Sequence, residues 1–188
     1  MTLPDPRCAG ALVLLATFTP ADARERDHAE AIAALLQTTP DPFSRAQFIP
    51  GHLTASAFVV DPPRSRVLLI LHAKLHRWLQ PGGHIEPGDA DLLAAARREV
   101  QEETGLGKLR LLGAPLDVDV HLIPAHKGDP AHRHYDVRFL FEATGRLVRA
   151  ADDAVQAKWV ALDAVGNIGS DESVMRAVRK IRGLWRKA

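Results

Sequence analysis

The fold of this 188-residue chain is decided by GGHIEPGD at residues 82–89 and REVQEETGL at residues 98–106. A glycine-rich loop leads into a predicted helix whose last turn carries Glu99, Glu102 and Glu103. Residues spaced three and four apart share one helix face, so the three carboxylates lie close together. Such a cluster is unfavourable unless a cation binds between its members. Mg²⁺ prefers oxygen ligands and often shares them with substrate phosphates, so the sequence predicts a magnesium site for a phosphorylated substrate.

The two stretches resemble the Nudix box, the signature of the Nudix hydrolases. Its pattern is Gly, five residues, Glu, seven residues and R-E-U-x-E-E-x-G-U, where U is bulky and apolar. Gly83 opens the box here, and residues 98–106 match its second half at every specified position. The first half departs from the pattern, because Asp89 replaces the first glutamate and eight residues separate it from Arg98. One residue therefore looks inserted between Ala90 and Arg97. WLQP at residues 78–81 and WVAL at 159–162 resemble flanking family sequence.

Hydrophobic periodicity places the remaining elements. A helix is expected from Thr19-Pro20 to Thr39, a hairpin from 55–60 and 66–72, and a loop over 77–88. A helix over 91–103 is followed by strands at about 109–112, 118–123, 135–142 and 157–162, and by a last helix over 171–182 capped by Ser170. These elements predict a layered α/β fold. The resemblance implies the Nudix-type α/β/α sandwich with a mixed β-sheet. Residues 1–50 are predicted to be a helical N-terminal extension packed on a Nudix hydrolase domain at 51–188.

The resemblance implies a Mg²⁺-dependent hydrolase, with Mn²⁺ as a second usable metal, that cleaves a phosphoanhydride bond in a nucleoside diphosphate linked to another moiety. ADP-ribose, nucleotide sugars, dinucleotides and nucleoside triphosphates are all candidate substrates. The metal would neutralise the pyrophosphate charge and activate a bound water. Arg98 would hold Glu102 through an i,i+4 pair. The general base is open between Glu103 and an outside residue such as Glu142. The expected metal ligands are Glu99, Glu102, Glu103 and, more weakly, the Gly82 carbonyl, while Glu86 and Asp89 are auxiliary candidates.

A histidine-rich segment follows the box, with His121, His126, His132 and His134 inside fourteen residues. If residues 132–134 are extended, His132 and His134 lie on one side of the strand. In one interpretation these imidazoles line the substrate pocket, and in the other the segment is a solvated loop. Its spacing matches no transition-metal motif. The predicted substrate-binding residues are Gly83, His84, Lys127, Arg133 and His134.

The amino-acid composition limits the classes of partner that this protein is expected to bind. The formal net charge of +1 argues against a large nucleic-acid footprint. No apolar run reaches the length of a membrane-spanning helix, and the lone Cys8 fits a reducing compartment, so a cytoplasmic location is expected. A signal peptide over residues 10–23 is the less favoured interpretation of the apolar N-terminal run, because Asp5 offsets Arg7. The expected partner is a small nucleotide or another diphosphate, and a homodimer is compatible with the sequence.

Two rival functions remain. Isopentenyl diphosphate isomerase shares the fold but needs a cysteine near its site, and Cys8 is poorly placed to supply it. A ligand-binding or sensor module could keep the fold without hydrolysis. Asp89 and the inserted residue favour that alternative, whereas the three retained glutamates oppose it.

Overall fold

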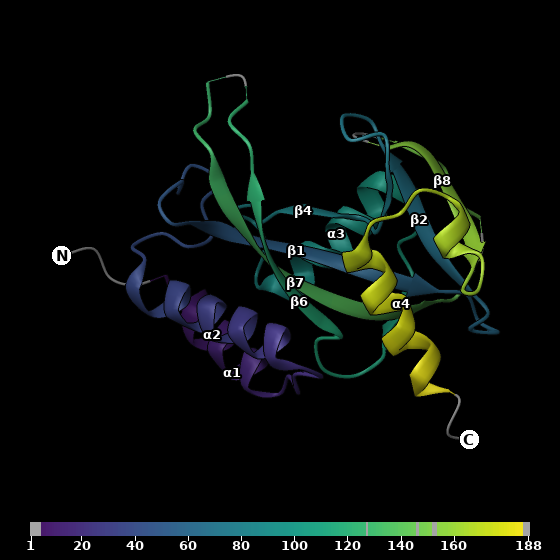
Figure 1. Cartoon of the computed structure of the whole chain (residues 1–188), viewed down its shortest axis with the longest axis horizontal. Coiled ribbons are helices and arrows are strands. Elements are labelled where there is room, and N and C mark those ends of the chain that lie inside the picture. Colours follow the sequence, from purple (N-terminus) through teal and green to yellow (C-terminus); the bar gives the residue numbers. More distant parts are fainter. Residues whose placement is uncertain (1–4, 127, 146, 152–153, 186–188) are drawn as a thin grey trace.

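The computed structural model describes residues 5–126, 128–145, 147–151 and 154–185. Within them, eight strands form one mixed sheet in the order β3-β2-β1-β7-β5 (Figure 1). β4 pairs with β1, β6 with β7 and β8 with β2. The strands are β1 Gly51–Val60, β2 Arg66–His72, β3 Trp78–Leu79, β4 Gly82–His84, β5 Leu109–Leu111, β6 Asp117–Ile123, β7 His132–Ala143 and β8 Ala154–Ala161.

Helices cover both faces of this sheet, as the sequence predicts for an α/β/α sandwich. α3 (Leu92–Thr104) packs on one face together with α1 (Arg7–Ala16) and α2 (Ala23–Thr38), around a large apolar core. α4 (Glu172–Leu184) covers a second core on the other face, next to the short 3₁₀ helix Val165–Asn167. Figure 1 shows α4 in front of the sheet and α3 behind it. Among the helices of the described residues, none has both the length and the apolar character to cross a bilayer.

The central strand β1 is buried along its whole length and presents two different faces. Successive side chains in a strand point to opposite sides. Leu53, Ala55, Ala57 and Val59 therefore join the core under α3, whereas Phe58 and Val60 join the core under α4. The residues that precede Phe58 on the α4 face are His52, Thr54 and Ser56, which are polar. On this face of the sheet, the apolar core under α4 is therefore followed by a row of buried polar side chains.

The helix of the box forms because both of its ends are capped. Asp91 is the N-cap residue, and its carboxylate accepts a hydrogen bond from the Ala94 amide at 2.7 Å. Gly105 ends the helix in the left-handed conformation at φ +73°, and its amide donates to the Gln101 carbonyl. Leu92, Ala96 and Val100 are buried against the sheet, so the carboxylates of the last turn are held at a fixed angle to it.

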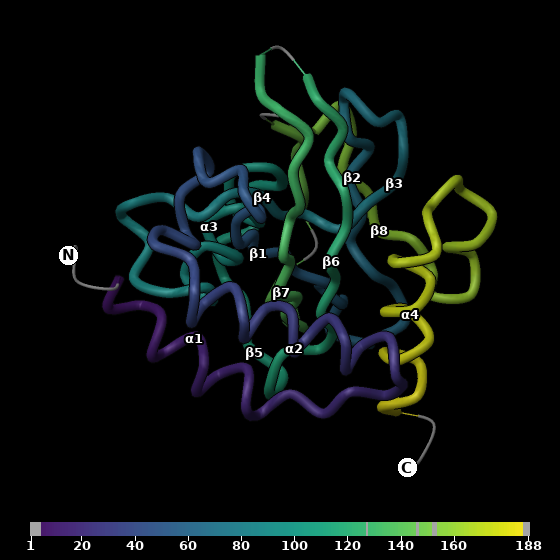
Figure 2. The backbone as a smooth tube through the Cα atoms, turned by 60° about the vertical axis from the view of Figure 1, so that its left-hand side comes forward, coloured from purple at the N-terminus to yellow at the C-terminus, as the bar shows by residue number. Residues whose placement is uncertain are grey.

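The N-terminal segment packs on the sheet through α1 and α2, which lie side by side in Figures 1 and 2. The apolar run near the N-terminus forms α1, with Cys8 and Ala11 buried. α2 begins at Ala23 with Asp22 as its N-cap rather than at Thr19-Pro20, because the Asp22 carboxylate accepts from the Glu25 amide at 2.9 Å. The domain boundary at residue 50 stays a prediction.

Two further expectations need correction. The segment 77–88 is not only a loop, because β3 pairs with β2 and β4 pairs with β1 through Ser56↔Gly82 and Ala55↔Gly83. Such two- and three-residue strands carry too little periodicity to be recognised from sequence. α4 is capped by Asp171 instead of Ser170, since the Asp171 carboxylate accepts from the Val174 amide at 3.0 Å.

Candidate active site

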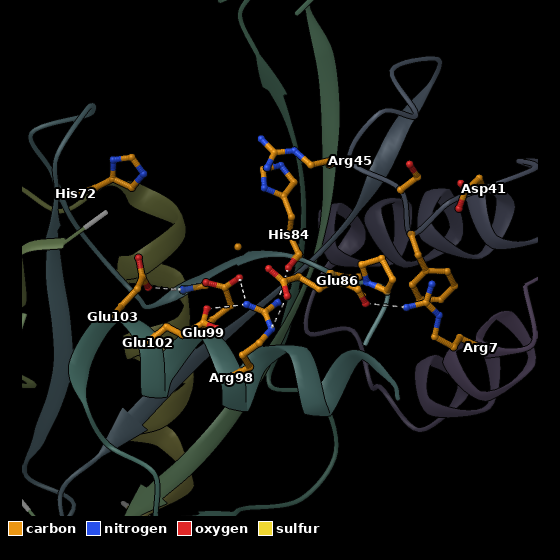
Figure 3. A pocket seen from close by; sticks show the side chains of 16 residues that line it. Arg7, Asp41, Arg45, His72, His84, Glu86, Arg98, Glu99, Glu102 and Glu103 are labelled. Atoms are coloured by element: carbon orange, nitrogen blue, oxygen red, sulfur yellow. Dashed lines mark hydrogen bonds and ion pairs between the residues drawn. The ribbon is translucent and has the colours of Figure 1, made fainter. Parts of the chain in front are cut away.

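A cavity of about 660 Å³ lies where the glycine loop meets the last turn of α3 (Figure 3). Glu99, Glu102 and Glu103 line one side of it, and Arg7 and Asp41 line the other. The floor is the backbone of β4 and the following loop. The complete lining is Arg7, Asp41, Phe43, Ser44, Arg45, His72, Gly82, Gly83, His84, Ile85, Glu86, Pro87, Arg98, Glu99, Glu102 and Glu103.

The two glycines allow β4 to approach both β1 and the helix closely. A Cβ on Gly82 would lie 2.2 Å from the Cβ of Ser56, and one on Gly83 would lie 2.7 Å from Oε1 of Glu99. Neither position has room for a side chain. The Gly82 amide donates to Oε2 of Glu103 at 3.0 Å, which fixes that buried carboxylate against the loop. The glycine loop therefore holds Glu103 by a hydrogen bond and lies in close contact with Glu99.

Arg98 holds the loop and the helix together. Its Nη1 donates to Oε1 of Glu99 at 3.0 Å and to Oε2 of Glu102 at 2.7 Å, which confirms the predicted i,i+4 pair. Its Nη2 donates to the His84 carbonyl at 2.8 Å. Arg98 contacts one oxygen of each glutamate. The second oxygen of each carboxylate, Oε2 of Glu99 and Oε1 of Glu102, makes no hydrogen bond to Arg98.

Asp89 supports Arg98 from the loop. The Arg98 guanidinium donates from Nε to Oδ1 at 3.1 Å and from Nη2 to Oδ2 at 2.9 Å, and Oδ2 also accepts from the Glu86 amide at 2.8 Å. Burial favours the neutral form of Asp89, but these hydrogen bonds and the charge of Arg98 keep its pKa below the ordinary value. Asp89 thus makes a complete ion pair despite the altered spacing. Glu86 is more exposed and lies 4.0 Å from Arg98.

The electrostatics of the glutamates fit a hard divalent cation. Burial raises the pKa of Glu99 to about 7; Arg98 opposes this shift, and the negative charge of Glu102 adds to it. The Glu99 side chain is 14% exposed and that of Glu102 is 44% exposed. A desolvated carboxylate beside like charges is stabilised by a cation, and Mg²⁺ takes one or two carboxylates plus substrate phosphates. The donor set therefore suits magnesium.

Several lining residues come from the N-terminal segment, which sequence reasoning did not place at the site. Arg7 of α1 donates from Nη1 to the carbonyls of Glu86 and Asp89 at 3.2 and 3.3 Å, and its guanidinium lies 4.3 Å from the centre of the Phe43 ring. Arg45 and Asp41, from the connector after α2, also line the cavity. The sequence carries no periodic or motif signal for these contacts.

The remaining predicted residues have different locations. His84 lines the cavity, and His134 lies behind it with ring centroids 5.2 Å apart. Arg133 is exposed and alternates onto the face opposite His134. Glu142 pairs with Arg64 at 2.7 Å and Arg110 at 2.6 Å, away from the cavity lining. Lys127 lies outside the described residues.

Comparisons with known proteins identify the family of this chain. The family model of the NUDIX domain matches residues 50–179. An asymmetrical bis(5'-nucleosyl)-tetraphosphatase from Sus scrofa is 46% identical over 48 residues, which cover 23% of this chain and 32% of that protein. The chain thus spans about a third of the length of the curated relatives it matches.

Two solved structures share the fold. The Ap4A hydrolase of C. elegans, in a binary complex, has a TM-score of 0.59 at 20% identity and covers 72% of this chain and 98% of its own. The NUDIX domain of Shewanella oneidensis NrtR, in complex with ADP-ribose, has a TM-score of 0.54 at 17% identity, with coverages of 70% and 86%. Because the family model spans more than half of the chain and includes the glycine loop and the three glutamates, this protein belongs to the Nudix hydrolase family.

Proposed function

We propose that the chain hydrolyses a phosphoanhydride bond in a nucleoside diphosphate linked to another moiety, with Mg²⁺ held by Glu99, Glu102 and Glu103. One observation carries the proposal: the carboxylates lie on one side of a cavity whose other lining includes Arg7 and Arg45 (Figure 3). A cation bound at the carboxylates would sit next to the phosphates. The guanidinium of Arg45 and that of Arg7, which is itself paired with Asp5 at 2.7 Å, would add positive charge to the cavity that receives a negatively charged substrate. Mn²⁺ would suit the same oxygen ligands.

When bound, the metal neutralises phosphate charge and lowers the pKa of a coordinated water. The chain's own contribution is to orient the ligands. Arg98 fixes one oxygen of Glu99 and of Glu102, and the Gly82 amide fixes one oxygen of Glu103. Ligands that are already oriented cost less conformational entropy when the cation and substrate bind. The Gly82 carbonyl is a further proposed ligand.

We assign the general base to Glu103 in preference to Glu142. Glu103 lines the cavity and is buried, and one of its oxygens is already held by the Gly82 amide. Glu142 lies in register with Val60, four residues beyond Ser56, which pairs with Gly82. Four strand residues span about 13 Å, too far for a hydrogen bond to a water at the glutamates.

Dinucleoside polyphosphates are the first substrate class to test. Two of the similar proteins are named for this substrate class, the pig tetraphosphatase and the C. elegans Ap4A hydrolase. A third similar structure contains ADP-ribose. Each of these molecules carries a chain of phosphates next to a nucleoside, which suits a cavity with carboxylates and guanidinium groups in its lining.

The non-hydrolytic alternative has lost its main support. Asp89 and the inserted residue favoured it, because a disturbed box could fail to organise its metal ligands. However, the pair between Asp89 and Arg98 is intact, and Arg98 still contacts Glu99 and Glu102. A binding module remains the outcome to expect if no substrate is turned over.

The experiment is a substrate panel with Mg²⁺ or Mn²⁺, spanning dinucleoside polyphosphates, ADP-ribose, nucleotide sugars and nucleoside triphosphates. Released nucleotide and phosphate are quantified for the wild type and for Glu102→Gln. Turnover that falls by about two orders of magnitude or more in the variant supports the proposal. Glu30→Gln, an exposed glutamate of α2, is the matched control and should retain activity. Binding of a nucleotide without any turnover across the panel would instead identify a binding module.

A further inference from the structure

Histidine side chains gather on one face of the sheet beside the cavity. β1 and β7 run parallel with His52 opposite His134, and β6 places His121 opposite His134 on the other side. His132 is two residues before His134, so it shares the same face. β4 adds His84 through its pairing with Thr54. Four strands therefore bring together imidazoles that are far apart in the sequence.

Three of these imidazoles approach closely enough to share one ligand. The ring centroids of His52 lie 5.0 Å from His132 and 4.8 Å from His134, and the last two are 5.2 Å apart. One ring nitrogen from each of the three lies within 4.8 Å of the others. No other group of three metal-ligating side chains reaches this proximity in the part of the chain that the structure describes.

Backbone carbonyls select the tautomer of two of the rings. Nδ1 of His52 lies 3.0 Å from the Gln47 carbonyl oxygen, and Nδ1 of His132 lies 2.8 Å from the Pro130 carbonyl oxygen. A carbonyl can only accept, so each Nδ1 carries the proton and each Nε2 presents a lone pair. Metal-binding histidines are commonly oriented in this way, with the second nitrogen donating to a carbonyl.

The two lone pairs point into the cluster. Nε2 of His52 is buried and has no hydrogen-bond partner, which is costly for a polar atom. Nε2 of His132 faces Nε2 of His134 at 3.3 Å. Two nitrogens bound tetrahedrally at about 2.1 Å from a zinc ion are about 3.4 Å apart, so this pair already has the required spacing. All three nitrogens lie within 4.8 Å of one another, so His52 would have to approach the other two by at most about 1.4 Å to complete the site.

Burial also disfavours the charged form of three imidazoles at this place, those of His52, His84 and His134. Burial lowers the pKa of His134 to about 2 and of His84 to about 4, and neighbouring imidazoles lower both further. Burial lowers the pKa of His52 as well, although its bond to the Gln47 carbonyl opposes the shift. A neutral imidazole is the form that binds a metal ion.

We propose that His52, His132 and His134 form a site for a divalent transition-metal ion of the zinc class, separate from the carboxylate site. Imidazole nitrogens suit Zn²⁺, Ni²⁺ or Cu²⁺, whereas Mg²⁺ prefers oxygen, so the two sites select different metals. His84 lies between them, because its ring is 5.1 Å from His52 and it lines the cavity. The metal would link β1 to β7 next to His84. Because Nδ1 of His52 is hydrogen-bonded to the Gln47 carbonyl, it would also stabilise the position of the connector between α2 and β1. This site goes beyond the proposed hydrolase and does not depend on it.

The test measures metal binding rather than activity. The full chain is stripped with a chelator and titrated with Co²⁺ or Zn²⁺, and bound metal is quantified after desalting. We expect one tightly bound equivalent and a visible Co²⁺ spectrum typical of a four-coordinate ion with three imidazole ligands. The doubly substituted Glu99→Gln/Glu102→Gln protein should keep this equivalent. His132→Phe and His134→Phe, which preserve a ring of similar size, should weaken it by about a hundredfold or more.

His76→Ala removes an exposed histidine of the β2–β3 turn and should bind metal like the wild type. Should the phenylalanine variants fail to fold, X-ray absorption spectroscopy at the zinc edge and imidazole ¹⁵N NMR of the wild type give the ligands directly. Three coordinated imidazoles support the proposal. It is overturned if the wild type retains no metal, if His132→Phe binds as tightly as the wild type, or if the first coordination shell contains only oxygen. Each result is independent of whether any nucleotide is hydrolysed.

Discussion

Arg98 and Asp89 form a two-point ion pair across the loop–helix junction, with Nε–Oδ1 and Nη2–Oδ2 separations of 3.1 and 2.9 Å. The same guanidinium contacts Glu99 and Glu102, so the pair connects the loop to the proposed metal ligands. The Asp89 side chain is only 7% exposed. Charge-assisted bonds of this two-point geometry fix orientation as well as adding stability. We therefore propose that Arg98 is a positioning residue rather than a group that contacts substrate.

Asp89→Asn tests that relationship. The amide keeps one acceptor for Arg98 but loses the charge, so Arg98 should hold the glutamates less firmly. We expect metal affinity and turnover to fall about 10- to 100-fold, as is usual for groups that orient metal ligands. The apparent Mg²⁺ affinity from activity titrations is the measurement. Asp89→Glu, which restores the charge, should recover most of the loss, and a variant as active as the wild type would contradict the assigned role.

Gly83→Ala addresses the close approach of the loop to Glu99. The added Cβ would lie 2.7 Å from Oε1 of Glu99, which forces the carboxylate out of its position. We expect weaker Mg²⁺ binding and at least about tenfold lower turnover. Gly88→Ala is the matched control in the same loop, because a Cβ there meets nothing within 4 Å. Equal activity of the two variants would show that the close contact has no functional role.

Arg7→Ala tests whether the N-terminal segment supports the box. Arg7 donates to the Glu86 and Asp89 carbonyls and packs on Phe43, so its removal should loosen the loop. We expect the free energy of unfolding to fall by about 1–2 kcal/mol and KM to rise. Urea denaturation and steady-state kinetics are the measurements. Arg26→Ala, on an exposed position of α2, should change neither.

Substitution of Glu103 and of Glu142 tests which of the two residues is the general base. Glu103→Gln should reduce kcat by about two orders of magnitude or more, because general-base catalysis typically contributes that much. Glu142→Gln should retain turnover, since its partners are Arg64 and Arg110. The kcat values at saturating Mg²⁺ decide between them. A large loss in Glu142→Gln with the fold intact would reverse the assignment.

A buried ionic cluster under α4 predicts acid sensitivity. Arg176 binds Asp117 and Asp119, and Arg138 lies 3.6 and 3.4 Å from the same two carboxylates. Burial alone would raise the pKa of both aspartates, but their hydrogen bonds and these positive charges outweigh it, so both values lie below the ordinary range. Carboxyls with a lowered pKa in the folded state stabilise it at neutral pH, and that contribution is lost as the pH falls below about 4.

Urea titrations at several pH values measure this effect. The wild type should lose about 1–3 kcal/mol of its free energy of unfolding between about pH 5 and pH 3. Arg176→Met should be less stable at pH 7 by about 3–5 kcal/mol, because it removes the positive charge that lies closest to the buried carboxylates of Asp117 and Asp119. The free energy of unfolding of this variant should also fall less than that of the wild type between about pH 5 and pH 3. An Arg176→Met protein with wild-type acid dependence would locate the sensitivity elsewhere.

The box helix was predictable because its signals are local. Asp91, the apolar face of Leu92, Ala96 and Val100, and Gly105 lie within fifteen residues. The sequence alone leaves the N-cap open between Asp89 and Asp91, and the structure uses Asp91. The hairpin of β1 and β2 was predictable for the same reason. The sequence places the apolar run that forms α1 only within the N-terminal extension, since its pattern does not distinguish a helix from a strand.

The rest of the site depends on contacts between distant residues. Arg7 reaches Asp89 across 82 positions, and no periodicity encodes that approach. His52 joins His134 only through the parallel register of β1 and β7, so a search of the histidine-rich segment alone could not include it. The burial that makes His134 neutral likewise arises from the whole sheet and not from its neighbours in sequence.

The Asp89–Arg98 pair also implies where this family's signature can change length. The extra residue lies between them, yet the ion pair closes because irregular backbone can absorb it before the helix begins at Leu92. An insertion between Arg98 and Glu103 would behave differently, since each added helical residue rotates everything after it by about 100°. Insertions and deletions in natural relatives should therefore accumulate before the helix and be absent within its last turn.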